Sequence, residues 1–346
     1  MKHYTLKVIG LRKETADTLT VVFKQPGLKK IKYQAGQYLT LIFHINGRRY
    51  IRPYSFSSAP GFDQDLEVTV KQVPGGIVSN HIADRLKTGD LVEVMEPMGS
   101  FVLNPDSITT ATHIVLWGAG SGITPLFSIL KEALSKNTGK QVTLVYGNRS
   151  LESVIFKDKI MALKTVYPNF TSWDFHTKLA ISEVNPTIIE GRIDPAKVLS
   201  VMQAEGDLNQ MLHYICGPTG LKESVKTALL GLGVNDQSIL TEDFEIVRDP
   251  VEFENISTRM VTVIKAGVKS LVEVVKGKSI LEAGLDAMLD LSYSCQTGSC
   301  LLCKAVLLKG EVKMIGLATR PEGLITDECL LCCSFPLVDN VEVAVA

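Results

Sequence analysis

The first hundred residues alternate between apolar and polar side chains, which is the pattern of half-buried strands. The alternation is clear in YLTLIFHINGRRYIR, residues 38–52, where Asn46-Gly47 predicts a tight hairpin turn. It returns in LEVTVKQV and DLVEVMEP, residues 66–73 and 90–97. Short strands separated by turn signals predict an antiparallel β-barrel over residues 1–105.

The pattern changes after this point, and residues 106–246 alternate apolar strands with amphipathic helices. THIVLWGAG, residues 112–120, precedes the helical TPLFSILKEALSK, and QVTLVYGNRS follows as another strand. MLHYICGPTG, residues 211–220, leads into ESVKTALLGLG in the same way. This order predicts an α/β domain with a doubly wound parallel sheet.

The last part of the chain predicts a third, smaller domain. Residues 247–257 are polar and contain a proline, so we interpret them as a linker. Within residues 258–346, TVIKAGVKSLVEVVKG predicts a hairpin and SILEAGLDAML a helix. The expected fold class is therefore multidomain: a β-barrel, a doubly wound α/β domain and a small α+β domain of β-grasp type.

Composition narrows the class of protein without naming a function. The 346 residues are 45% hydrophobic and 21% charged with a net charge of −1, so nothing in the bulk numbers indicates binding to nucleic acid or an anionic membrane. No apolar run reaches the ~18 residues of a transmembrane helix. The first strand lacks the features of a signal peptide. We therefore expect a cytoplasmic, monomeric protein.

Cysteine is concentrated near the end of the chain, because six of the seven cysteines follow position 294. Cys295, Cys300 and Cys303 have the C-x4-C-x2-C spacing that, with a distant fourth thiol, binds a plant-type [2Fe–2S] cluster. Gly298 suits such a loop because glycine adopts positive φ readily. An alternative pairs Cys300-x2-Cys303 with Cys329-x2-Cys332 as a structural zinc site. The 25-residue spacer is long for that site and Cys295 would be unexplained, so iron–sulfur is favoured.

Two stretches of the first domain carry groups that suit a ligand with a phosphate and an aromatic ring system. Arg52-Pro53-Tyr54-Ser55 offers a guanidinium for pyrophosphate, a ring for stacking and a hydroxyl for a ring nitrogen. Gly75 and Gly76 then precede Ser79, where we expect a helix to begin and attract phosphate.

The second domain carries groups that suit a nicotinamide dinucleotide. GAGSGITP, residues 118–125, joins a strand to a helix, and the next predicted strand ends in Asn148-Arg149-Ser150. Because a cation rather than an acid stands there, NADPH is favoured, with NADH still open. Cys216-Gly217-Pro218 and Glu242-Asp243-Phe244 follow the two later strands.

Pro97-x-Gly99-x-Phe101 closes the first domain. In this order, R-x-Y-S, GG-x-x-S, P-x-G-x-F, G-x-G-x-G-x-x-P and C-G-P resemble the ferredoxin–NADP reductase superfamily. The resemblance implies FAD, with Arg52 and Ser79 at its pyrophosphate, Tyr54 and Phe244 on the flavin faces, and Ser55 near N5 beside Glu242. It also implies roles at the second dinucleotide. These fall on Gly118, Gly120, Ser121, Gly122, Thr124, Arg149, Ser150, Cys216, Gly217 and Pro218, with Cys216 beside the nicotinamide.

The C-terminal part, residues 259–346, resembles a plant-type ferredoxin. In that family the fourth ligand stands four residues before a proline, which implies Cys332, before Pro336, over Cys329 and Cys333. The family usually has glycine after the second cysteine, whereas this chain has Leu301. A bulky residue there is expected to change the hydrogen bonding around the sulfurs and to limit access of solvent.

The domain order resembles the reductase components of multicomponent oxygenases, notably the phenylacetyl-CoA epoxidase and ketosteroid hydroxylase groups. It implies hydride transfer from NADPH to FAD and single-electron steps through [2Fe–2S] to an oxygenase component. Three alternatives stay open. The same redox chain could serve a hybrid-cluster protein, a cytochrome or a ferredoxin. A flavin reductase could carry a structural zinc module. The chain could also be a non-catalytic electron-transfer protein like the accessory component of dihydroorotate dehydrogenase.

Overall fold

The computed structural model describes residues 2–27, 29–103, 111–136, 139–178, 188–206, 208–246, 249–317 and 319–345. Internal contacts divide the chain into two compact units, Met1–Phe43 with Pro53–Asp243, and His44–Arg52 with Phe244–Ala346. The predicted boundary between residues 105 and 106 lies outside the described residues, and so do residues 247 and 248 of the predicted linker.

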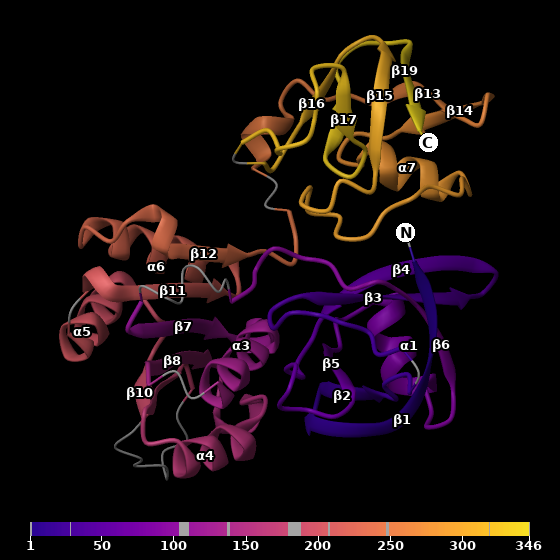
Figure 1. The fold of residues 1–346 in the computed structure, drawn as a ribbon. Helices are drawn as coiled ribbons and strands as arrows, with labels where there is room; N and C mark the ends of the chain where they lie inside the picture. Colours follow the sequence, from indigo (N-terminus) through magenta and orange to yellow (C-terminus); the bar gives the residue numbers. More distant parts are fainter. Residues whose placement is uncertain are drawn as a thin grey trace. The chain divides into compact units, whose positions relative to one another are not determined.

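An antiparallel sheet forms the first part of the chain, in the order β4-β3-β6-β1-β2-β5 (Figure 1). Its strands are β1 (His3–Thr15), β2 (Thr18–Phe23), β3 (Tyr38–Ile45), β4 (Arg48–Ser55), β5 (Leu66–Lys71) and β6 (Leu91–Met95), and its helix is α1 (Ile77–Arg85). The predicted hairpin turn is confirmed, because Asn46 and Gly47 both have positive φ, 51° and 76°.

The following domain is the predicted doubly wound parallel sheet, in the order β10-β9-β8-β7-β11-β12. Its strands are β7 (His113–Ala119), β8 (Gln141–Asn148), β9 (Phe170–His176), β10 (Ile188–Glu190), β11 (Met211–Cys216) and β12 (Ile239–Glu242). Its helices are α3 (Ile123–Ser135), α4 (Lys157–Val166), α5 (Pro195–Glu205) and α6 (Thr219–Gly231).

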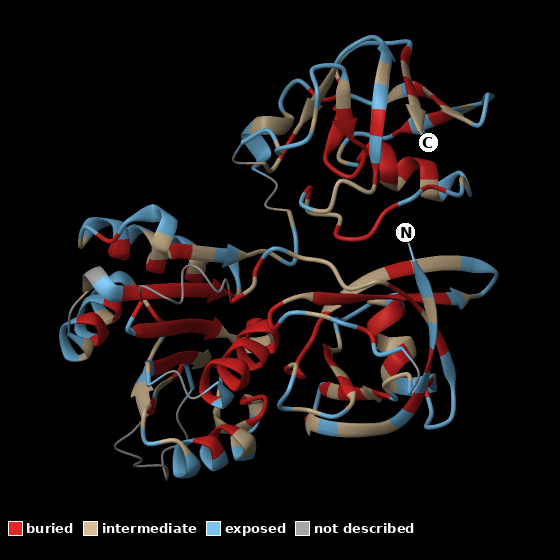
Figure 2. Ribbon diagram, viewed as in Figure 1, coloured by how far each residue is buried: buried red, intermediate tan, exposed pale blue. Residues whose placement is uncertain are grey.

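The central strands of this sheet read as continuous apolar runs because helices cover both faces. Residues of α3 and α4 join one buried cluster with Leu116 of β7, whereas residues of α5 and α6 join a second with Trp117. Figure 2 shows the central strands buried along most of their length. Short 3-10 turns connect the elements: η1 (Gly120–Gly122), η2 (Leu151–Ser153), η3 (Leu208–Gln210) and η4 (Asp236–Ser238).

The second unit contains a five-stranded sheet, β14-β13-β19-β15-β17, and a two-stranded sheet, β16-β18. Its elements are η5 (Pro250–Phe253), β13 (Arg259–Lys265), β14 (Val268–Val274), α7 (Ile280–Asp286), β15 (Lys304–Lys309), β16 (Val312–Met314), β17 (Glu328–Leu330), β18 (Ser334–Pro336) and β19 (Val341–Val345). The predicted hairpin and helix are present as β13–β14 and α7.

Part of the predicted linker packs into this unit. Phe253 meets the ring of Phe335 edge-on at 4.9 Å between centroids, and Ile256 is buried with Phe335 and Ile315. The apolar residues of this polar stretch therefore anchor its second half to the small domain. Among the described helices of the chain, none is long and apolar enough to cross a membrane.

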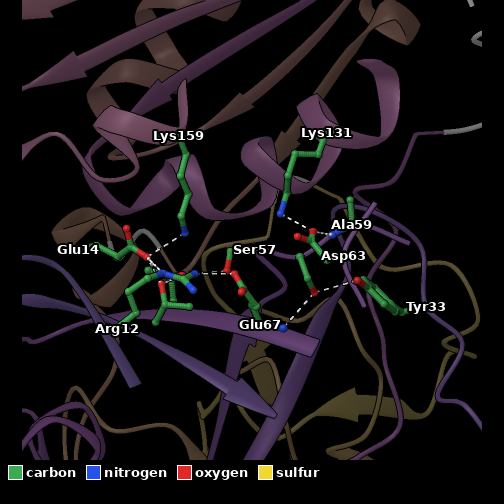
Figure 3. Close-up of polar contacts among 12 residues, drawn as sticks. Arg12, Glu14, Tyr33, Ser57, Ala59, Asp63, Glu67, Lys131 and Lys159 are labelled. Atoms are coloured by element: carbon green, nitrogen blue, oxygen red, sulfur yellow. Dashed lines mark hydrogen bonds and ion pairs between the residues drawn. The ribbon is translucent and has the colours of Figure 1, made fainter. Parts of the chain in front are cut away.

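A buried ion pair joins the two domains of the first unit. Lys131 of α3 donates to Asp63 of the sheet domain at 2.5 Å, and its side chain is only 4% exposed (Figure 3). Asp63 also accepts the Ala59 N–H at 2.7 Å, and the lysine ammonium lies 4.8 Å from the Phe127 ring centroid. Burial lowers the pKa of Lys131, while Asp63 favours its charged form.

A second polar cluster crosses the same interface. Glu14 of β1 accepts from Lys159 of α4 at 3.1 Å, from Arg12 at 2.9 Å and from Thr20 at 2.7 Å, and Arg12 also donates to Glu67 at 2.8 Å (Figure 3). Each charge therefore has an opposite partner, which the Glu14 carboxylate requires because its side chain is only 8% exposed. The two clusters fix the sheet domain against helices α3 and α4.

Replacing Lys131 with methionine should destabilise the first unit by roughly 3 kcal/mol, because the largely buried Asp63 carboxylate loses its counter-ion. Urea unfolding monitored by flavin release would measure this. The double variant Lys131→Met/Asp63→Asn should recover part of the loss. As a control, Lys71→Met removes an ion pair with Asp17 in which both side chains are more than a third exposed, and should cost under about 1 kcal/mol. Equal losses for Lys131→Met and Lys71→Met would contradict the role of the buried pair.

Candidate functional site

Strand β4 carries the first group of predicted flavin residues. Arg52 and Tyr54 lie on one face of this strand and Ser55 on the other, because side chains alternate along a strand. Ser55 is buried, whereas Arg52 and Tyr54 are half-buried, and the Arg52 guanidinium donates to the Ile51 carbonyl at 2.8 Å. The strand thus presents a cation and an aromatic ring on the same side, which suits a dinucleotide with a pyrophosphate and a flat ring system.

The two glycines before α1 shape a candidate phosphate cradle. Gly75 has a φ of +73°, and a Cβ at Gly76 would lie 2.5 Å from the Ser79 hydroxyl and 3.0 Å from the Val73 carbonyl oxygen. No side chain caps the first turn of α1, so its amides are available to an anion. The helix begins at Ile77 rather than at Ser79. Ser79 is therefore inside the first turn, where its hydroxyl accepts the Val73 N–H at 3.2 Å.

The nicotinamide motifs meet at the carboxyl ends of three neighbouring strands. Gly118 of β7, Cys216 of β11 and Glu242 of β12 are aligned in register across the parallel sheet. A Cβ at Gly122 would lie 2.1 Å from the Cys216 carbonyl oxygen, so only glycine allows the two loops to pack this closely. Ligands of open α/β sheets bind at this edge, so these strand ends are the candidate nucleotide site.

The glycine turn leads directly into α3, whose first turn has neither an acidic residue nor a side-chain cap. Gly120 has a φ of +54° with open space where a Cβ would stand. Thr124 donates its hydroxyl hydrogen to the Ser121 carbonyl at 3.0 Å. Gly217 packs against Leu221 and Ala119, and Pro218 caps α6. This turn at a helix N-terminus fits a pyrophosphate.

Cys216 is a neutral thiol at this edge. It is 1% exposed, and burial, followed by the neighbouring Glu242 and Asp243 carboxylates, raises its pKa well above the usual value. A neutral, compact side chain beside two acids can contact a nicotinamide ring without acting as a nucleophile. Asp243 is held by Lys222 at 2.5 Å, and Phe244 is 47% exposed. The flavin role of Phe244 therefore stays a prediction.

The end of β8 brings cations together from two strands. Arg149 is exposed, and its carbonyl accepts the Lys178 N–H at 2.7 Å just beyond β9. Ser150 donates its hydroxyl hydrogen to Glu152 at 2.5 Å, which lowers the pKa of that carboxyl group. Sequence reasoning missed Lys178, because its proximity to Arg149 depends on the pairing of β8 with β9.

The cysteine loop provides backbone donors to sulfur. The Cys295 Sγ accepts N–H groups from Thr297 and Cys300 at 3.4 Å each. Hydrogen bonding from the Cys300 thiol and these donors lowers the pKa of Cys295 to about 4, and the same thiol pair, together with burial, raises the pKa of Cys300. Gln296, Gly298 and Leu301 all have positive φ, between 57° and 83°, which produces the tight turn.

Four of the thiols form two pairs. Cys295 is hydrogen-bonded to Cys300, and Cys303 to Cys332. Among the residues that the structure describes, no three His, Cys, Asp or Glu side chains meet as a single-ion site. A [2Fe–2S] cluster needs two thiolates for each of its two irons, so the four paired cysteines fit this cluster.

The two remaining C-terminal cysteines have other partners. Cys333 donates from sulfur to the Leu330 carbonyl at 3.5 Å and is also hydrogen-bonded to Cys332, and Cys329 is hydrogen-bonded to Ser334. Both are buried. Of the three, Cys332 is therefore the thiol that lies within hydrogen-bonding reach of Cys303.

Family models match all three parts of the chain. An oxidoreductase FAD-binding domain matches residues 5–103, an oxidoreductase NAD-binding domain residues 116–227, and a 2Fe-2S iron-sulfur cluster binding domain residues 263–337. The third match identifies the cysteine site as a 2Fe-2S site and so replaces the alternative of a structural zinc site.

Characterised relatives align over nearly the whole chain. A component of the 1,2-phenylacetyl-CoA epoxidase of Escherichia coli is 30% identical, with 98% of this chain and 97% of the relative covered. The ferredoxin reductase component of 3-ketosteroid-9-alpha-monooxygenase from Rhodococcus rhodochrous is 31% identical, with 98% and 95% covered.

A solved structure shares the fold. Phthalate dioxygenase reductase aligns with a TM-score of 0.69 at 23% identity, with 99% of this chain and 98% of that structure covered. The chain belongs to the family of NAD(P)H-dependent iron–sulfur flavoprotein reductases, with ferredoxin-reductase-type electron transfer from NAD(P)H through FAD to [2Fe–2S] and with reductase components of oxygenases among its homologues.

Proposed function

We propose that this chain is the reductase component of a multicomponent oxygenase and delivers electrons from NADPH to a non-haem iron oxygenase component. The observation that carries the proposal is the nearly full-length similarity to two proteins named as parts of an epoxidase and a monooxygenase. We further propose that the protein is cytoplasmic and monomeric when free of its partner. The domain limits stay as predicted at 1–105, 106–246, 247–257 and 258–346.

For the flavin, the proposed contacts follow the geometry of β4 and α1. FAD can exchange electrons in pairs with nicotinamide and singly with an iron–sulfur cluster. Arg52 and the first turn of α1 hold the pyrophosphate, with Ser79 in that turn. Tyr54 covers one flavin face, Ser55 hydrogen-bonds near N5, and Gly75 and Gly76 let the backbone approach. Phe244 covers the other face, and Glu242 holds Ser55.

For the nicotinamide dinucleotide, the glycine turn and the strand ends act together. The amides near Gly118, Gly120 and Gly122 bind the pyrophosphate with Ser121 and Thr124. Cys216, Gly217 and Pro218 border the nicotinamide, and the Cys216 thiol meets the ring as a neutral group. Arg149 and Ser150 bind the 2′-phosphate, and Lys178 adds a second positive charge. The cluster ligands are Cys295, Cys300, Cys303 and Cys332.

Electron delivery to the oxygenase component tests the whole proposal. NADPH added anaerobically should bleach the flavin bands and then produce the EPR signal of a reduced [2Fe–2S] cluster. Addition of a purified oxygenase component of the phenylacetyl-CoA epoxidase type, with phenylacetyl-CoA and oxygen, should reoxidise the protein faster than oxygen alone does and form epoxide. Reduction of cytochrome c without any oxygenase turnover would point to another acceptor.

Replacing Cys332 with serine should abolish assembly of the cluster while FAD stays bound, because one iron loses a thiolate. Iron analysis and the visible spectrum would measure this. Cys329→Ser and Cys333→Ser are the matched controls and should keep full iron content. Loss of iron in Cys333→Ser but not in Cys332→Ser would show that the ligand assignment is wrong.

Replacing Arg149 with alanine should raise the KM for NADPH roughly 10- to 100-fold, because a charge-assisted hydrogen bond to phosphate contributes about 1.5–3 kcal/mol. The KM for NADH should change little, since NADH lacks the 2′-phosphate. Steady-state kinetics with both nucleotides would measure the difference. Lys226→Ala, which removes a cation from α6, is the control. Equal effects of Arg149→Ala on both nucleotides would exclude the 2′-phosphate role.

A further inference from the structure

Leu301 adopts a backbone conformation that favours glycine. It follows Cys300, its φ is +60°, and its side chain is half-buried. Leucine in this left-handed region is strained, because its Cβ approaches the following carbonyl oxygen. Glycine would relieve the strain at once. We therefore expect the Leu301 side chain to make contacts that offset the backbone strain.

The Leu301 side chain packs against Gly323. Its Cδ1 lies 3.3 Å from the position that a Cβ of Gly323 would occupy, and Gly323 itself has a φ of +88°. Leu317 makes a similar contact with the cysteine loop itself, because its Cδ2 lies only 2.4 Å from the corresponding position at Gly298. Gly298 is inside the cysteine loop, between Cys295 and Cys300. Leu317 thus packs on the loop that carries three of the proposed ligands, and Leu301, inside that loop, packs on Gly323.

The segment that receives Leu301, residues 319–328, is held in place. One Arg320 guanidinium nitrogen donates to the carbonyls of Ile325 at 2.5 Å, Thr326 at 3.2 Å and Glu328 at 2.7 Å. The Glu328 carboxylate pairs with Lys304 at 2.7 Å, and Lys304 directly follows Cys303. The segment is therefore fixed to the end of the cysteine loop, and the contact with Leu301 is part of a rigid arrangement.

The proposed ligands differ in exposure. Cys295, Cys303 and Cys332 are between 4% and 7% exposed, whereas Cys300 is half-buried. The most exposed of the four cysteines is thus the one next to Leu301. Apolar groups around a metal site control the access of solvent, and exposure to solvent is one of the factors that set a cluster's potential.

We infer that Leu301 and Leu317 form an apolar cover over the cysteine loop, and that the cover limits the access of water, oxidants and chelators to the cluster. The inference rests on the proposed ligand set. It explains why a strained leucine stands beside Cys300. Neither leucine binds iron. Their side chains act by excluding solvent.

The test is the rate at which the holoprotein loses its cluster absorbance in air with EDTA. Leu301→Ala keeps a residue with a Cβ in the left-handed conformation but shortens the side chain, whereas Leu301→Gly also relieves the strain. Both variants and Leu317→Ala should bleach several-fold faster than the wild type. Iron content before the challenge should be unchanged, which separates a missing cover from a wrong ligand set.

Two controls isolate the side chain. Ala266→Gly relieves a left-handed residue, with φ of +48°, in the β13–β14 turn. Ile325→Ala removes a side chain that is 68% exposed from the segment 319–328. Both should bleach at the wild-type rate. The inference is overturned if Leu301→Ala bleaches at the wild-type rate, even when Leu301→Gly is fast, because the backbone would then be responsible. It is also overturned if the controls bleach as fast as the leucine variants.

Discussion

The ion pair between Lys131 and Asp63 fixes the geometry on which the nucleotide chemistry depends. Hydride transfer requires reacting atoms held within about 3–3.5 Å, so two domains that each bind one dinucleotide must keep a constant relative position. A buried ion pair contributes less to stability than its attraction suggests, because both charges lose water. It is, however, very sensitive to displacement, since a small shift would leave each charge alone. The Glu14–Lys159 contact and the bond from Ser128 to the Ser58 carbonyl add further fixed points to the same interface.

The nucleotide edge of the parallel sheet depends on close backbone packing. Gly122 lies where any side chain would overlap the Cys216 carbonyl, so the glycine turn and the C-G-P loop position each other. That contact sets Cys216 between Gly118 and Glu242 in the register of the sheet. Burial and the adjacent carboxylates keep the thiol protonated. The site therefore has no group prepared for nucleophilic or acid–base chemistry at Cys216, which agrees with the redox function of the family.

The cysteine loop achieves its shape by a different means. Three residues with positive φ turn the chain tightly enough for two backbone amides to reach the Cys295 sulfur. Only one of these three residues is glycine. Strain is therefore present at Gln296 and Leu301, and surrounding contacts such as Leu301 with Gly323 must maintain it.

Local patterns in the sequence were enough to predict the elements and motifs that depend on neighbouring residues. The alternation of side chains predicted β3–β4 and their Asn46-Gly47 turn, strand–helix alternation predicted the doubly wound sheet, and the C-x4-C-x2-C spacing indicated a two-iron loop. Strand β2 was not singled out, because the alternation of its TLTVVF sequence ends at Val21-Val22. Only the tertiary structure decided the contacts between residues that are far apart in the sequence. Lys131 and Asp63 are 68 positions apart, Lys178 meets Arg149 only because β8 pairs with β9, and Ile256 joins a core that its polar neighbours conceal. Spacing could not distinguish Cys329, Cys332 and Cys333, which stand within five residues. The resemblance to ferredoxins singled out Cys332. In the fold Cys332 is the thiol turned toward Cys303, because side-chain direction depends on the backbone path between β17 and β18.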